Sequence, residues 1–153
     1  MAMESNSSTD EYKLNKFKSH GRAEFERQGQ ILICHATGPF NKELVLALAT
    51  VEPKLQAIIS DGNWADITVL KGSALATPDA LSTLSEYLKS LTEQGVISCA
   101  SALVITEQTE GFRFTIPHII NAFADTGTEL KLFKNLEEAK AWTLNKLNLA
   151  NQN

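Results

Sequence analysis

The side chains of this 153-residue sequence that could do chemistry are three histidines, two cysteines, and scattered serines and acids. His20, His35 and His118 lie far apart, and no two have the i, i+4 spacing that places two metal ligands on one helix face. Ser73 lies in a Gly-Ser-Ala segment that lacks the G-x-S-x-G pattern of a nucleophile elbow. We therefore predict no catalytic residue, no metal site and no cofactor.

The cysteines, the charge balance and the hydropathy pattern narrow the class of protein. Cys34 and Cys99 each lie in an apolar run and form no CxxC pair, which predicts buried free thiols. A net charge of -4 argues against a nucleic-acid binder, which usually carries a basic surface. The first residues lack the positive start and apolar core of a secretory signal, and no apolar stretch approaches the ~20 residues that span a bilayer. These features predict a cytoplasmic protein without a transmembrane segment.

An apolar, strand-like run is followed by a helix-start signal at three places, where Asn41, Thr77 and Thr115 are the expected N-caps. In a sheet built this way, strands end and helices begin at one edge, and ligands bind there. Helix N-termini carry unpaired N–H groups that can hold an anion. The alternative is that these residues only cap their helices. The candidate ligand- or partner-binding residues at this edge are Phe40, Asn41, Lys71, Gly72, Ser73, Thr77 and Arg113.

The elements that must position these residues alternate between strands and helices. We expect a hairpin of strands around Gly29, further strands over 64–70, 96–105 and 129–133, and a weak edge strand over 11–17. Gly38-Pro39 should end the second arm of the hairpin, and Lys71 to Ala76 should form a loop. Helices are expected after the three caps and over 136–147. Pro53 either kinks the first helix or divides it.

This order predicts one α/β domain over residues 10–148, with a polar tail at 1–9 and a frayed end at 149–153. Its sheet should have about five strands with a parallel centre, and it should be mixed because the first hairpin is antiparallel. About four helices should pack on it. The last helix offers Ala139, Trp142, Leu144 and Leu147 for burial, and Trp64 should also lie in the core.

The segments that end the strands and begin the helices resemble those of the STAS-like superfamily, especially the small stand-alone bacterial proteins of its SpoIIAA-like branch. The resemblance covers about 21–147 and rests on four segments. They are Thr37-Gly38-Pro39-Phe40-Asn41, Leu75-Ala76-Thr77-Pro78-Asp79-Ala80, Gly95 leading to Ala100-Ser101-Ala102-Leu103-Val104, and the closing Phe133-x-x-Leu136-Glu137-Glu138-Ala139-x-x-Trp142. It implies a compact sheet with helices and a role in binding or regulation. In anti-sigma-factor antagonists a kinase partner phosphorylates a serine after the second central strand, in an Asp-Ser-x-Gly loop. Leu70-Lys71-Gly72-Ser73-Ala74 stands at that position, so the resemblance implies Ser73 as the phosphoacceptor by position alone.

The leading interpretation is therefore a non-catalytic, cytoplasmic regulatory or protein-interaction module. The alternative is a small-molecule or lipid-binding protein that holds an anionic or lipid ligand at the helix N-termini, with the apolar helix after Thr115 as a lid. An enzyme is a third interpretation, which would need His118 or His35 beside Ser73 or an acid. The edge strand over 11–17 could also pair across a homodimer.

Overall fold

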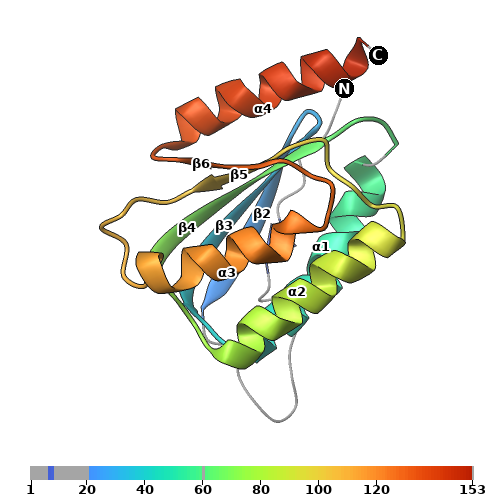
Figure 1. Ribbon diagram of the computed structural model, residues 1–153. Helices are drawn as coiled ribbons and strands as arrows, with labels where there is room; N and C mark the ends of the chain where they lie inside the picture. Colours follow the sequence, from blue (N-terminus) through green and yellow to red (C-terminus); the bar gives the residue numbers. More distant parts are fainter. Residues whose placement is uncertain (1–6, 9–20, 60, 153) are drawn as a thin grey trace.

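The computed structural model describes residues 7–8, 21–59 and 61–152, which form one mixed sheet with four helices (Figure 1). The six strands lie in the sheet in the order of the sequence. The strands are β1 (Ser7–Ser8), β2 (Arg22–Gln28), β3 (Ile31–Phe40), β4 (Ala65–Ala76), β5 (Ser101–Val104) and β6 (Leu130–Phe133). The helices are α1 (Lys42–Ile59), α2 (Pro78–Glu93), α3 (Phe112–Ala124) and α4 (Leu136–Asn151).

Strands β1, β2 and β3 pair antiparallel, whereas β3, β4, β5 and β6 pair parallel. A helix connects the two strands of each parallel pair, because the chain must cross back over the sheet before it can start a parallel neighbour. These three connecting helices, α1, α2 and α3, cover one face of the sheet, and α4 crosses the other (Figure 1). The predicted α/β class, the parallel centre and the four helices are confirmed. The sheet has a sixth strand because β1, which falls in the expected tail, pairs with β2.

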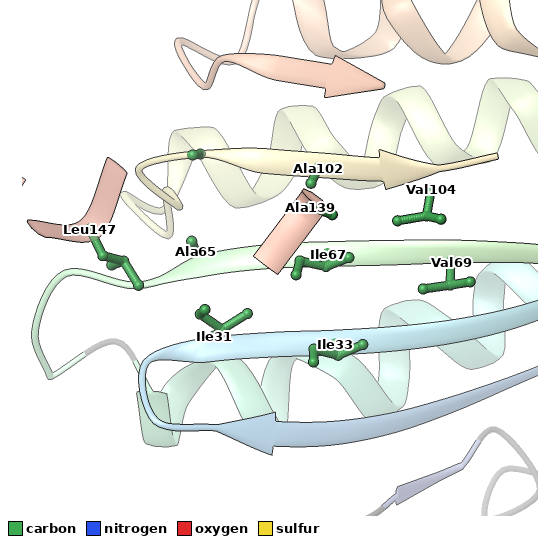
Figure 2. Close-up of a cluster of buried hydrophobic side chains, with 10 residues drawn as sticks. Ile31, Ile33, Ala65, Ile67, Val69, Ala102, Val104, Ala139 and Leu147 are labelled. Atoms are coloured by element: carbon green, nitrogen blue, oxygen red, sulfur yellow. The ribbon is translucent and has the colours of Figure 1, made fainter. Parts of the chain in front are cut away.

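The face under α4 is a dry apolar layer made by alternate residues of the parallel strands. Ile33 and Ile67 are neighbours across β3 and β4, and both are fully buried. Figure 2 shows them with Ala139 and Leu147, which reach the layer from α4. On α4 the buried polar residue is Thr143, whereas Leu144 is 54% exposed and the expectation that it is buried is wrong.

Strands β3 and β4 run further than the sequence predicts. β3 continues through the cis peptide between Gly38 and Pro39, and β4 continues to Ala76, so the predicted break and the predicted loop are both wrong. Gly38 faces Gly72 across the two strands, and a Cβ on Gly38 would lie 1.9 Å from the carbonyl oxygen of Ser73. The absence of a side chain at Gly38 therefore lets the two strand ends approach closely. The strand expected over 96–105 is shorter in the structure, where β5 spans Ser101–Val104.

Two of the three predicted helix caps are confirmed. The Asn41 Oδ1 accepts the N–H of Leu44 at 3.0 Å, and the Thr77 Oγ1 accepts the N–H of Ala80 at 3.2 Å. The third cap is wrong, since α3 begins at Phe112 after Gly111 and Thr115 lies inside it. Pro53 does not divide α1, which runs unbroken to Ile59.

Three expectations concern the ends of the chain and the membrane. The expected edge strand over 11–17 lies outside the described residues. α4 continues to Asn151, past the residue at which we expected the chain to fray. Among the described helices, none combines the length and the apolar character that a membrane crossing would need.

Candidate functional site

A pocket lies between the sheet and the three helices α1, α2 and α3, and we call it the helix-side pocket. Its volume is about 150 Å³, the size of an engineered protein cavity that binds benzene. Most of its lining is aliphatic or aromatic. The larger apolar side chains in that lining are Phe40, Leu44, Val45, Leu48, Leu70, Leu81, Leu84, Leu88, Leu103, Ile119, Phe123 and Leu130.

The floor of the pocket is formed by the strand residues whose side chains point to the face of the sheet opposite the dry layer. Asp66 on β4 pairs in register with Ser101 on β5, and Thr68 lies two residues further along β4. Successive side chains of a strand point to opposite faces, so these three polar residues share the face opposite Ile67. The buried sheet surface on the pocket side is therefore partly polar.

A carboxyl and a phenol meet in the wall of the pocket. The Tyr87 hydroxyl on α2 donates to the Glu52 Oε1 on α1 at 2.6 Å, and both residues line the pocket. Burial raises the pKa of the Glu52 carboxyl to about 7, against the lowering effect of the Tyr87 hydrogen bond. Burial also raises the pKa of Tyr87, and the adjacent Glu52 raises it further. Glu52 can therefore exist in either protonation state near neutral pH, while Tyr87 remains a hydrogen-bond donor.

A second carboxyl, that of Asp66, is held by two serines. Its Oδ1 accepts hydrogen bonds from the Ser98 hydroxyl at 2.8 Å and from the Ser101 hydroxyl at 2.5 Å. Burial raises the pKa of Asp66, and the two hydroxyls limit the rise. Cys34 lies on the same face of the sheet, and burial together with Glu52 and Asp66 raises the pKa of its thiol well above the ordinary value. The Cys34 thiol is thus kept in its neutral, poorly nucleophilic form.

One polar atom of the pocket lining lacks a partner among the described residues. The side chain of Thr115 on α3 is 2% exposed, and its Oγ1 makes no hydrogen bond in the described part of the chain. An unsatisfied buried hydroxyl costs roughly 1–3 kcal/mol, so such an atom calls for an explanation. Thr115 is also one of the residues that line the pocket.

The residues predicted from the sequence lie mostly at the strand-end edge, outside the pocket. The N–H of Thr77 donates to the carbonyl oxygen of Phe40 at 3.1 Å, which joins the end of β3 to the start of α2. Ser73 bridges to Glu110 in the segment before α3, close in sequence to Arg113. The edge therefore brings the predicted residues together, and Phe40 is the one that also lines the pocket.

The predicted edge residues differ in their exposure. Lys71, Gly72, Thr77 and Arg113 are exposed, and Asn41 caps α1. Ser73 is only 8% exposed, and its Oγ accepts the N–H of Leu75 at 3.1 Å. A kinase could reach that hydroxyl only if the end of β4 opened.

Neither His35 nor His118 contacts Ser73 in the described part of the chain, and His20 lies outside it. The His35 Nε2 lies 3.3 Å from the Glu26 Oε1, on the sheet face away from the pocket. The ring of His118 packs at 5.8 Å from the ring of Phe114 on the exposed side of α3. Within the described ranges, no three His, Cys, Asp or Glu side chains converge as metal ligands would.

Sequence reasoning missed the polar residues of the pocket, although a signal was present for each. Glu52 continues the helical series of Leu44 and Leu48 at i+4 spacing, so it falls on an apolar stripe. Tyr87 lies three residues after Leu84 and four before Leu91, so it too falls on an apolar stripe, on α2. Asp66 and Thr68 interrupt a strand that should be apolar on both faces. A charged or hydroxylated residue at such positions indicates a buried polar group.

Comparisons with known proteins identify the architecture. No protein-family model matches the sequence, and no curated protein matches it significantly. A crystal structure of an uncharacterized protein of the DUF3478 family from Shewanella loihica PV-4, described as having a SpoIIAA-like fold, superposes with a TM-score of 0.53 at 15% identity. The superposition covers 86% of this chain and 99% of that one. This chain therefore has a SpoIIAA-like fold, as the segments between its strands and helices predicted.

Proposed function

We propose that this protein binds a small, largely apolar molecule in the helix-side pocket and does not transform it. The observation that carries the proposal is an apolar pocket of about 150 Å³ with a few polar groups in its wall. Protein interiors are normally packed without voids of this size, and an empty one costs stability. A few converging polar groups in an apolar lining are typical of ligand sites.

Binding is better supported than catalysis by the chemistry of the pocket wall. Glu52 is engaged by a phenol, Asp66 is engaged by two serines, and the thiol of Cys34 is held neutral. None of these contacts pairs a nucleophile with a general base in the way that acyl-transfer sites do. The proposal departs from the ligand alternative drawn from the sequence, because it places the ligand beneath the helices instead of at their N-termini.

Toluene, a neutral ring of the right size, is a suitable first probe. We expect saturable changes in the NMR signals of Leu48, Leu84 and Ile119, which come from two sides of the pocket. We also expect a higher melting temperature, because a ligand that binds only the folded state stabilises it. Absence of saturable binding, or changes confined to other surfaces, would refute the proposal.

A pocket-filling variant gives the matched control. Leu84→Trp should place an indole in the pocket and abolish toluene binding, whereas Leu144→Trp on the exposed side of α4 should leave it unchanged. If Leu84→Trp does not fold, Leu48→Phe fills the same space from α1. Equal toluene binding by a folded pocket variant and the Leu144 variant would also refute the proposal.

A second candidate function, a protein-interaction module, is favoured by the strand-end edge. Leu75 and Phe114 are 39% and 56% exposed there, and Leu75 packs against the backbone of Gly111 at the start of α3. Exposed apolar side chains beside the exposed Lys71 and Arg113 suit a protein partner. Phe114→Ser should release a partner that co-purifies from native cells, and Leu144→Ser should not. Retention of the partner by Phe114→Ser would contradict this assignment.

A further inference from the structure

The charges around the helix-side pocket restrict what it can hold. Of the described residues that line it, two carry carboxyl groups, Glu52 and Asp66, and none is a lysine, arginine or histidine. The remaining titratable groups in the lining, Cys34 and Tyr87, are acids as well. An anion that enters would meet like charge in a medium where charges are poorly screened. It would also find no cation to offset the loss of its hydration.

The polar groups of the wall differ in what they can offer a ligand. Tyr87 occupies one site on the Glu52 carboxyl, and a carboxylate can accept several hydrogen bonds. Asp66 accepts two hydroxyls already. Glu52, with one such bond at Oε1, is therefore the less occupied of the two carboxyls. Thr115, whose buried Oγ1 has no partner among the described residues, adds a further polar residue to the lining, from α3.

We propose that the helix-side pocket selects a neutral or positively charged ligand with a hydrogen-bond donor, which binds to the Glu52 carboxyl, and that it excludes carboxylate and phosphate ligands. This inference rests on the proposed function and adds the chemical class of the ligand. It replaces the anionic ligand expected from the helix N-termini. Small aromatic or aliphatic alcohols and amines fit the class, with the apolar part among the leucines of α1 and α2 and the donor at Glu52.

Four ring compounds of nearly equal size test the selection. Toluene, benzyl alcohol, benzylammonium and benzoate differ in the polar group on one benzyl or phenyl unit, and their affinities are measured by calorimetry at pH 8. Benzyl alcohol and benzylammonium should bind at least about tenfold more tightly than benzoate, which is about 1.4 kcal/mol. Benzoate binding as tightly as benzyl alcohol would overturn the inference.

The Glu52→Gln variant identifies the responsible group. It keeps the shape and an acceptor oxygen but removes the negative charge, so the preference for benzylammonium over benzoate should fall by about tenfold. Glu86→Gln removes an exposed charge from α2 and should leave the preference unchanged. An unchanged preference in Glu52→Gln would overturn the role of Glu52. If that variant does not fold, the rank order in the unaltered protein still decides the ligand class.

The two proposals fail in different ways. If none of the four compounds, toluene included, binds in the pocket, the proposed function fails. If toluene binds and benzoate matches or exceeds the alcohol and the amine, the pocket is a binding site but the selection proposed here is wrong. Tighter binding of the alcohol and the amine, lost on substitution of Glu52, supports both.

Discussion

The two faces of the sheet are built from alternate residues of the same strands, yet they differ in packing and in polarity. Under α4, Ile33, Ile67 and Ala139 are fully buried in an apolar layer (Figure 2). Under α1, α2 and α3, the next residues along β4 are Asp66 and Thr68, which line a pocket. One helix lies on the first face and three lie on the second (Figure 1). The three helices and the sheet line the helix-side pocket.

This difference suggests a division between stability and binding. The apolar layer under α4 stabilises the fold because it removes apolar surface from water. The opposite face contributes less to stability, because it contains a pocket and buries carboxyl groups whose ionisation is disfavoured there. Sites that bind ligands are commonly suboptimal for stability in this way.

The largest effect should come from removing a side chain of the dry layer. Ile67→Ala should lower the free energy of unfolding by about 4 kcal/mol, because the surrounding layer cannot close over the cavity. Leu84→Ala, on the wall of a pocket that already exists, should cost about 2 kcal/mol or less. Urea denaturation of both variants measures the contrast. Equal losses would show that the two faces do not differ in packing.

A smaller effect concerns pH and arises on the pocket face alone. The pKa of Glu52 is about 7 in the folded protein, above its ordinary value of 4.5, so between these values the folded state holds a proton that the unfolded state has lost. Stability from this group is complete below pH 4.5 and is lost as pH rises to 7, by at most about 3 kcal/mol. Urea denaturation at pH 5 and pH 7.5 should therefore show a loss with rising pH that Glu52→Gln reduces.

The control for this pH effect is Glu86→Gln, which removes an exposed carboxyl from α2. Its loss of stability between the two pH values should match that of the unaltered protein. A Glu52→Gln protein with the full loss would show that Glu52 is not the group that titrates.

The smallest effect compares two buried threonines, one from each face. Thr143 on α4 donates to the carbonyl oxygen of Ala139 at 2.9 Å, whereas Thr115 on α3 has no partner in the described ranges. Thr143→Val should cost up to about 1 kcal/mol, and Thr115→Val should be neutral or stabilising by about 1 kcal/mol. Thermal unfolding without ligand measures both. A clear loss of stability in Thr115→Val would mean that its hydroxyl is already satisfied.

Local patterns in the sequence are enough to predict the alternation of strands and helices, the caps at Asn41 and Thr77, and the two faces of β4. These features depend on local preferences and on periods of 2 and 3.6 residues, which can be read without knowing the fold. The caps are local because each involves a side chain and an N–H three residues apart. Two boundaries were predicted wrongly, the strand end at Gly38-Pro39 and the loop over Lys71 to Ala76. Both depend on tertiary pairing, because the ends of β3 and β4 continue as strands by pairing with each other.

The position of the candidate site, in contrast, depends on how elements remote in sequence pack together. Glu52, Asp66, Tyr87 and Thr115 come from α1, β4, α2 and α3, and no local pattern indicates that four such elements enclose one space. The sequence placed polar residues on buried stripes, but it could not show whether each would be solvated, paired with another or directed into a pocket. That outcome depends on how the helices pack across the sheet, because packing sets both the distances between remote side chains and the volume left between them.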